Sequence, residues 1–259
     1  MATFLFDSTI FGPVFSRRLG MSLGINLLSK NGKICNFNCI YCECGLTPFL
    51  QPGTSAMPSQ KEVKLLLEER LKRAVAEGEK IDTITFAGNG EPTLHPDFNA
   101  IIDDTLKVRS EYLPDARIAV LSNATLIADE KVFSSLTKID LNILKLDTVI
   151  EKTLRIINCP NDRFSLTETI GNLRKFSGNL IIQTLFLRGV YNNEPVDNTL
   201  PSEVEPWLEA IKQIQPACVM IYTIARDTPL KNLNRISRQK LLGIADKVNK
   251  LGIETQVSA

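Results

Sequence analysis

The chain has 259 residues, of which 44% are hydrophobic and 23% are charged, as expected for a soluble globular protein. Its 30 Lys and Arg residues and 29 Asp and Glu residues leave a net charge of +1, which argues against a broad basic surface for nucleic acid or an anionic membrane. The sequence contains neither a secretory signal pattern nor an apolar run near the ~18 residues of a membrane helix, so we expect a cytoplasmic protein without membrane contact.

Short apolar runs alternate with amphipathic helical patterns along the chain. The predicted strands are residues 24–28, 81–87, 118–122, 141–146, 180–187 and 218–224. The predicted helices are residues 59–77, 97–110, 128–137, 166–176, 204–213 and 237–251. The first helix begins with the capping-box pair Ser59 and Glu62, and Gly78 ends it.

Apolar strands that alternate with helices indicate a parallel sheet buried on both faces. The pattern therefore predicts an α/β fold, either a partial (β/α)6 barrel or a doubly wound open sheet. In both folds, ligands bind at the carboxyl ends of the strands. Because no linker or repeat interrupts the pattern, we expect a single domain over residues 1–259.

Four of the six cysteines lie between positions 35 and 44, after the first predicted strand. Cys35, Cys39 and Cys42 have C-x3-C-x2-C spacing, and three soft thiolates this close together suit zinc or an iron–sulfur cluster. A structural zinc site normally takes a fourth ligand from a second Cys or His pair, and the sequence has no such pair. On a [4Fe–4S] cluster, three thiolates leave one iron open to bind a methionine moiety. We expect no ligand role for Cys44, while Cys159 and Cys218 are predicted bystanders.

A glycine-rich turn directly follows the second predicted strand, and its residues are Gly88, Asn89, Gly90 and Glu91. Glycines at a strand end let backbone carbonyls approach a ligand closely, and a carboxylate accepts hydrogen bonds from an ammonium group. An ordinary turn before a helix is the alternative interpretation.

Polar residues also occur at or near the ends of later strands. Asn123 and Asp147 follow the third and fourth predicted strands, and Gln183 lies within the fifth. Such residues need hydrogen-bond partners, either in a ligand or inside the core. The single histidine, His95, precedes a proline, so we expect it to satisfy a turn or lie at the surface rather than act in catalysis.

The cysteine spacing, with the aromatic Tyr41 just before the third cysteine, resembles that of the radical S-adenosylmethionine (radical SAM) superfamily. The segments FGPVFSRRLG, SLGIN, TFAGNGEPTLHP, VLSNATL and FSGNLIIQTLFLRGVYNN resemble a group of small single-cluster Fe–S oxidoreductases, distantly related to wyosine-type tRNA-modifying enzymes. The likeness covers nearly the whole chain. It departs at Phe15, where proline is expected, and at residues 145–148, where a serine-containing strand end is expected.

This resemblance implies a partial (β/α)6 TIM-like barrel with its active site at the carboxyl ends of the strands. It implies a [4Fe–4S] cluster on the three cysteines and S-adenosylmethionine bound near it. The implied ligand-binding residues are Tyr41, Gly88, Asn89, Gly90, Glu91, Asn123, Asp147 and Gln183. Arg17 and Arg18 would hold a phosphate or carboxylate of the substrate.

The implied reaction is reductive cleavage of S-adenosylmethionine to a 5′-deoxyadenosyl radical, which abstracts hydrogen from a substrate. A low-potential donor such as flavodoxin or ferredoxin would supply the electron. We expect a tRNA or nucleotide substrate. The alternatives are an activase that acts on a glycyl-radical enzyme and, from another class, a non-catalytic metal-binding module.

Overall fold

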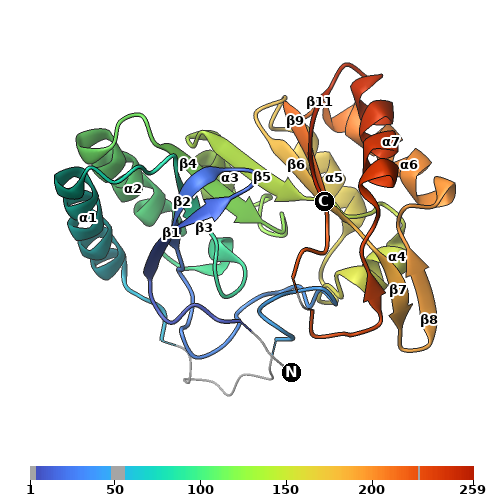
Figure 1. Ribbon diagram of the computed structural model, residues 1–259, viewed down its shortest axis with the longest axis horizontal. Helices are drawn as coiled ribbons and strands as arrows, with labels where there is room; N and C mark the ends of the chain where they lie inside the picture. The colour runs from blue at the N-terminus through green and yellow to red at the C-terminus, as the bar shows by residue number, and fades with distance from the viewer. Residues whose placement is uncertain (1–3, 48–55, 227) are drawn as a thin grey trace.

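A computed structural model describes residues 4–47, 56–226 and 228–259 (Figure 1). One sheet of eight strands has the order β1-β2-β3-β4-β5-β6-β9-β11. The strands from β2 to β11 in that order are parallel, and β1 pairs antiparallel with β2. Strand order follows chain order throughout, without the reversal that defines a doubly wound sheet. The sheet curls, and the predicted partial barrel is confirmed.

The six predicted strands are all present, together with two further strands at the edges of the sheet. Their bounds are β1 Ile10–Ser16, β2 Gly20–Ile25, β3 Thr83–Phe86, β4 Arg117–Ser122, β5 Leu141–Lys145, β6 Ile181–Phe186, β9 Cys218–Thr223 and β11 Glu254–Ser258. The pattern missed β1 and β11 because edge strands lack a continuous apolar run. In β1, Pro13 interrupts the run and Phe15 is 74% exposed.

The six predicted helices are also present, with ends shifted by up to three residues. The helices are α1 Gln60–Glu77, α2 Phe98–Tyr112, α3 Glu130–Thr137, α4 Glu151–Ile157, α5 Leu166–Arg174, α6 Pro201–Ile214 and α7 Arg238–Asn249, with a 3-10 turn at Pro92–Leu94. Ser59 Oγ accepts from Glu62 N at 3.2 Å, which confirms the predicted start of α1. Helix α4 was not predicted, because seven residues carry too little periodicity.

A second sheet, of three strands, was not predicted. It consists of β7 Arg188–Tyr191, β8 Glu194–Asp197 and β10 Leu233–Asn234, and Figure 1 shows β7 and β8 beside α4. Leu187 and Val196 in this region pack in one apolar cluster with Phe37, Ile40 and Ile157. The small sheet thus helps to support the segment that carries the cysteines.

The main core lies between the barrel sheet and its helices, and its largest buried side chains are Trp207, Phe86, Phe98 and Phe186. A separate, smaller cluster fills the inside of the barrel at the amino ends of the strands and consists of Leu19, Ala119, Ile143 and Met220. No helix within the described residues has the length and apolar character needed to cross a membrane.

Candidate active site

Residues 33–45, here named the cysteine loop, cross the carboxyl ends of the parallel strands. On one side the loop pairs with the turn after β3, where Ile34 N donates to Asn89 O at 2.8 Å and Glu91 N donates to Ile34 O at 3.0 Å. On the other side Ile40 N donates to Ile157 O, at the end of α4, at 3.0 Å. The loop is therefore fixed at two points of the barrel rim.

The three spaced cysteines occupy different electrostatic environments within this loop. Burial raises the pKa of Cys35 to about 12 and that of Cys39 to about 11. The pKa of Cys42 is lowered to about 6, chiefly by its hydrogen bond with Cys44 and further by the ammonium of Lys33. The Cys44 thiol also donates to Gly88 O at 3.4 Å, so this fourth cysteine joins the loop to the glycine turn.

The glycine turn, residues 88–91, packs tightly against its surroundings. A Cβ on Gly90, which has φ +139°, would lie 1.8 Å from Ile34 O, and one on Gly88, with φ +151°, would lie 2.5 Å from Asn26 Oδ1. Gly90 is therefore needed for the cysteine loop to reach the turn, and Gly88 for the close approach of the Asn26 side chain. The buried side chain of Asn89 bonds Phe6 and Ser29, so this amide anchors the fold.

Glu91 and Asn123 join the glycine turn to the end of β4. The buried Glu91 carboxylate accepts from Thr93 N at 3.1 Å, from Thr93 Oγ1 at 2.6 Å and from Asn123 N at 2.6 Å. Burial raises the pKa of Glu91. The Asn123 amide donates to Asn36 Oδ1 at 2.7 Å and reaches Cys35 Sγ at 3.7 Å. Contact of Glu91 with a ligand amino group stays a prediction, since its recorded partners are in the protein.

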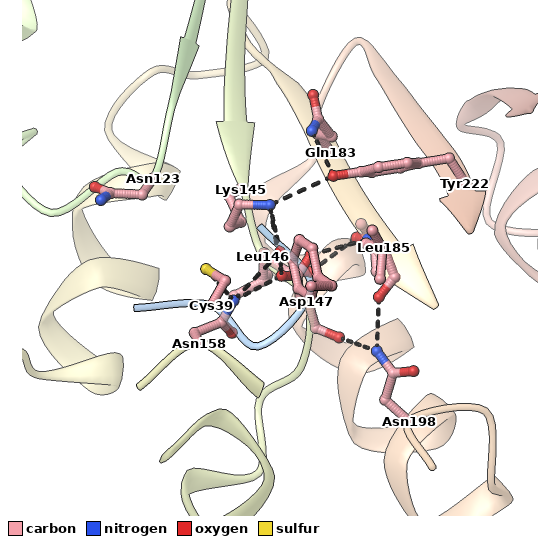
Figure 2. Close-up of polar contacts among 12 residues, drawn as sticks. Cys39, Asn123, Lys145, Leu146, Asp147, Asn158, Gln183, Leu185, Asn198 and Tyr222 are labelled. Carbon is pink, nitrogen blue, oxygen red and sulfur yellow. Dashed lines mark hydrogen bonds and ion pairs between the residues drawn. The ribbon is translucent and has the colours of Figure 1, made fainter. Parts of the chain in front are cut away.

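Asp147, just beyond β5, is the centre of a buried hydrogen-bond network (Figure 2). Its carboxylate accepts from Tyr41 OH, from Asn158 Nδ2 at 2.7 Å and from Leu185 N at 2.9 Å, and it pairs with Lys145 Nζ at 3.5 Å. Burial and the neighbouring carboxylate raise the pKa of Tyr41 well above its usual value. Asp147 therefore fixes the cysteine loop, through Tyr41, onto the carboxyl end of the sheet.

A second polar group lies deeper in the barrel and is also visible in Figure 2. Gln183 Nε2 donates to Tyr222 OH at 2.7 Å, and Lys145 Nζ lies 3.4 Å from the same hydroxyl and 2.7 Å from Tyr41 OH. Although burial disfavours its charge, attraction to Asp147, Tyr222 and Cys39 raises the pKa of Lys145 above its usual range. Gln183 Oε1 is buried and has no partner among the described residues.

Residues 32–200, which contain the cysteine loop, the glycine turn and Asp147, match the family model of the radical SAM superfamily. The chain belongs to the radical SAM superfamily. It is therefore a radical SAM enzyme, and its family implies S-adenosylmethionine and an iron–sulfur cluster as cofactors.

Curated relatives match most of this chain. A UPF0026 protein of Helicobacter pylori is 30% identical over 242 residues, which are 90% of this chain and 71% of the relative. A UPF0026 protein of Methanocaldococcus jannaschii is 34% identical, over 80% of this chain and 60% of the relative. A Brachyspira hyodysenteriae protein named GTPase Obg is 28% identical over 90% of this chain, which spans only 32% of that protein.

Solved radical SAM structures share the fold at low sequence identity. A radical SAM methyltransferase from Sphaerobacter thermophilus has a TM-score of 0.66 at 17% identity, covering 92% of this chain and 65% of its own. Streptococcus suis SuiB bound to S-adenosylmethionine has a TM-score of 0.62 at 13% identity, covering 88% and 49%. These likenesses support the partial barrel. At this level of identity they do not identify a substrate for this chain.

The sulfur environment of this radical SAM enzyme fits an iron–sulfur cluster. Within the described residues, no group of three His, Cys, Asp or Glu side chains is arranged to hold a metal ion, so the fit depends on what surrounds each sulfur. Phe37 N donates to Cys35 Sγ and Asn158 Nδ2 donates to Cys39 Sγ, both at 3.4 Å, while Lys33 lies beside Cys42. N–H donors and a cation stabilise thiolates, the form in which cysteines bind iron.

The structure does not bring the two predicted substrate arginines to the rim that carries the cysteines. Both lie in the turn between β1 and β2, at the amino ends of the parallel strands. Arg17 is exposed and donates to Ala259 O at 2.6 Å. The Arg18 guanidinium lies 4.7 Å from the ring centroid of Tyr222, and its Nη1 is buried without a partner among the described residues. Arg18 thus approaches the barrel interior, whereas Arg17 does not.

His95 is buried rather than exposed, and both ring nitrogens are used in turns. Nε2 lies 2.8 Å from Pro58 O, and Nδ1 accepts from Asp97 N at 3.1 Å. The expectation that it satisfies a turn is confirmed, and the alternative of a surface position is wrong.

Three residues at the site were missed by the sequence analysis: Lys33, Asn158 and Tyr222. Lys33 stands two positions before Cys35, and its proximity to the cysteines could have singled it out. Asn158 follows the unpredicted helix α4, and Tyr222 lies within a strand whose facing direction the pattern did not define.

Proposed function

We propose that the enzyme reductively cleaves S-adenosylmethionine at a [4Fe–4S] cluster held by Cys35, Cys39 and Cys42. The supporting observation is that the loop carrying these cysteines pairs directly with the glycine turn at the carboxyl rim of a radical SAM barrel. When bound, the cluster supplies one electron that splits S-adenosylmethionine into methionine and a 5′-deoxyadenosyl radical able to take hydrogen from a substrate. Radical SAM enzymes need an electron donor, and we propose flavodoxin or ferredoxin.

The chain's own residues bind and orient these groups. We propose that the backbone of residues 88–91 and the Asn123 amide face S-adenosylmethionine, since both border the cysteine loop. Gln183 Oε1 has no partner among the described residues and is suited to accept from a ligand hydroxyl. Asp147 already has several protein partners, so its proposed contribution to cofactor binding is to position Tyr41 and the loop.

Anaerobic reconstitution tests this proposal directly. Iron and sulfide are quantified, the reduced cluster is followed by electron paramagnetic resonance (EPR) with and without S-adenosylmethionine, and 5′-deoxyadenosine is measured by chromatography. We expect the EPR signal to change on adding S-adenosylmethionine, because an open iron binds it. Cys39→Ala should abolish 5′-deoxyadenosine formation, while Cys218→Ala, in strand β9, should retain it. Formation of 5′-deoxyadenosine by Cys39→Ala under dithionite would contradict the cluster assignment.

We propose a nucleotide or tRNA substrate, from the likeness to the wyosine-type group. The partnerless Arg18 Nη1 supports a substrate with a phosphate or carboxylate group, since an unpaired guanidinium nitrogen attracts one. Copurification of tRNA or nucleotide with the anaerobically isolated enzyme tests this. Copurification of a large enzyme activated by the chain would instead support the glycyl-radical activase, and failure to bind S-adenosylmethionine in calorimetry would support a non-catalytic module.

A further inference from the structure

A buried lysine stands among the cysteines without an acidic partner. Lys33 is 2% exposed, and its Nζ donates to Gly45 O at 3.0 Å. No carboxylate among the described residues forms an ion pair with it. Removing an ammonium from water without an anion beside it costs several kcal/mol, on the order expected for a buried ion. The position therefore requires a negative neighbour.

The nearby carboxylates are engaged elsewhere. Glu43 pairs with Arg226 at 2.7 Å, and Glu91 is hydrogen-bonded to Thr93 and Asn123. Lys33 instead lies within the cysteine loop: it stands two residues before Cys35, and its Nζ bonds Gly45 O in the turn where Gly45 N donates to Cys42 O at 2.9 Å. The anion that this buried lysine lacks is therefore one that the cysteines would provide as thiolates.

The three cysteine sulfurs differ in the donors and charges that surround them. Cys39 receives Asn158 Nδ2 at 3.4 Å, and the charge of the nearby Lys145 is offset by Asp147 at 3.5 Å. The Lys33 ammonium, enclosed between Cys35 and Gly45, has no such carboxylate among the described residues. Net charge and hydrogen bonds around the sulfurs set the reduction potential of an iron–sulfur cluster. In a partly buried site, an uncompensated full charge has a larger effect than a neutral dipole.

We propose that Lys33 is a positioning residue whose buried positive charge counters the thiolate-bound cluster and makes the cluster easier to reduce. The inference rests on the proposed function, since it assumes a cluster on Cys35, Cys39 and Cys42. In the step concerned, one electron passes from an external reductant to the cluster. Lys33 forms and breaks no covalent bond.

The test is a potentiometric titration followed by EPR on reconstituted wild type, Lys33→Met, Lys33→Arg and Lys30→Met. Lys30 is an exposed lysine three positions away and serves as the matched control. At the potential where the wild-type cluster is half reduced, we expect the reduced-to-oxidised ratio to fall about tenfold in Lys33→Met, which corresponds to about 59 mV for one electron. Lys33→Arg should stay within about twofold of wild type, because the charge is kept, and Lys30→Met should be unchanged.

Iron content, S-adenosylmethionine affinity and far-ultraviolet circular dichroism are measured on the same samples. A folded Lys33→Met that loads no iron, beside Lys33→Arg that loads fully, also supports the proposal. An unchanged ratio in fully loaded Lys33→Met overturns it, as does a Lys33→Arg variant that behaves like Lys33→Met. A loss of S-adenosylmethionine affinity at an unchanged ratio overturns it in favour of contact with the ligand carboxylate.

Two further outcomes are distinguishable. If Lys33→Met does not fold, Lys33→Gln takes its place under the same expectations, because glutamine is uncharged and polar. If wild type itself forms no EPR-active cluster, the proposed function fails and this inference fails with it. If wild type forms the cluster and cleaves S-adenosylmethionine while the Lys33 variants match it, only this inference fails.

Discussion

The two ends of the barrel interior differ in chemistry although the same strands line both. At the amino end, Ala119, Ile143 and Met220 pack with Leu19 in an apolar cluster. Residues two apart in a strand face the same side of the sheet. On the inner face of β5, the residue after Ile143 is therefore Lys145. On the inner face of β9, the residue after Met220 is Tyr222.

The change from apolar to polar takes place within a single pleat of each strand. In β6 the same step leads from Ile181, which packs against the apolar cluster, to Gln183, whose amide oxygen has no partner among the described residues. Burial of the apolar end stabilises the barrel, and burial of the polar end is tolerated because Tyr41, Tyr222 and Asp147 pair its donors. We therefore expect substitutions at the apolar end to change mainly the free energy of unfolding. Substitutions at the polar end, only two positions further along each strand, should also change cofactor binding and cleavage.

The largest effect is expected at the polar end, from Asp147→Ala. Tyr41, Asn158, Lys145 and Leu185 N would lose their shared acceptor, and Lys145 would stay buried without its carboxylate. Breaking a buried pair in this way costs about 3–5 kcal/mol. We expect unfolding at lower denaturant concentration together with loss of 5′-deoxyadenosine formation, because Tyr41 no longer fixes the cysteine loop.

Chemical denaturation of the cluster-free protein and a chromatographic assay of the reconstituted protein measure the two effects separately. Asp147→Asn, which keeps one acceptor oxygen, is the matched control and should retain part of both. Wild-type cleavage by a folded Asp147→Ala variant would show that the network does not position the loop.

The next effect is expected at the apolar end, from Ile143→Ala. Deleting a buried isoleucine side chain costs about 2–5 kcal/mol through lost burial and the cavity left behind. Since the polar layer lies two residues away and keeps its hydrogen bonds, we expect S-adenosylmethionine affinity and the EPR signal of the cluster to be unchanged at low temperature. Denaturant unfolding and calorimetry check this. Loss of ligand affinity at full folding would mean that the two layers are coupled.

Much of the fold was predictable because the strands of a parallel sheet, buried on both faces, are short apolar runs that a sequence displays locally. The edge strand β11, helix α4 and the three-stranded sheet were not predictable in this way. Strand β11 is polar in ETQVS, α4 has seven residues, and the three-stranded sheet depends on contacts with a strand at residues 233–234. These elements form because of tertiary packing, and the local sequence pattern contains little information about such packing. The single-domain organisation over residues 1–259 stays a prediction.

Part of the candidate site was also predictable from the sequence and part was not. The cysteines and the glycine turn are contiguous motifs, so the sequence alone indicated their chemistry. The structure adds that Gly90 is needed for contact with Ile34. The roles of Asp147 and Asn158 arise from pairing between segments 11 residues apart, with Asn158 also reaching across to Cys39. Sequence alone identified Asp147 as a polar strand end, and only the fold indicates that its partners lie within the protein.

A smaller effect is expected from Gln183→Met, which removes the partnerless amide oxygen and keeps the side-chain volume. The Tyr222 hydroxyl retains Lys145 at 3.4 Å, so the free energy of unfolding should change by less than about 1 kcal/mol. Loss of one hydrogen bond to a ligand corresponds to about a fivefold to tenfold weaker affinity. Calorimetry with S-adenosylmethionine, on reconstituted wild type and variant, measures this. Equal affinities would assign the amide oxygen to the substrate or to the fold and not to the cofactor.

The smallest effect is expected at the amino end of the barrel, from Arg17→Ala. This side chain is exposed, lies at the end of the barrel away from the cysteine loop, and contacts only Ala259 O among recorded partners in the described residues. Exposed substitutions of this kind change the free energy of unfolding by about 0.5 kcal/mol or less, and 5′-deoxyadenosine formation should stay within about twofold of wild type. Arg18→Met is the matched comparison, because Arg18 reaches Tyr222 in the polar layer. If Arg17→Ala loses cleavage while Arg18→Met keeps it, chemistry reaches the amino end and the division of the barrel interior is wrong.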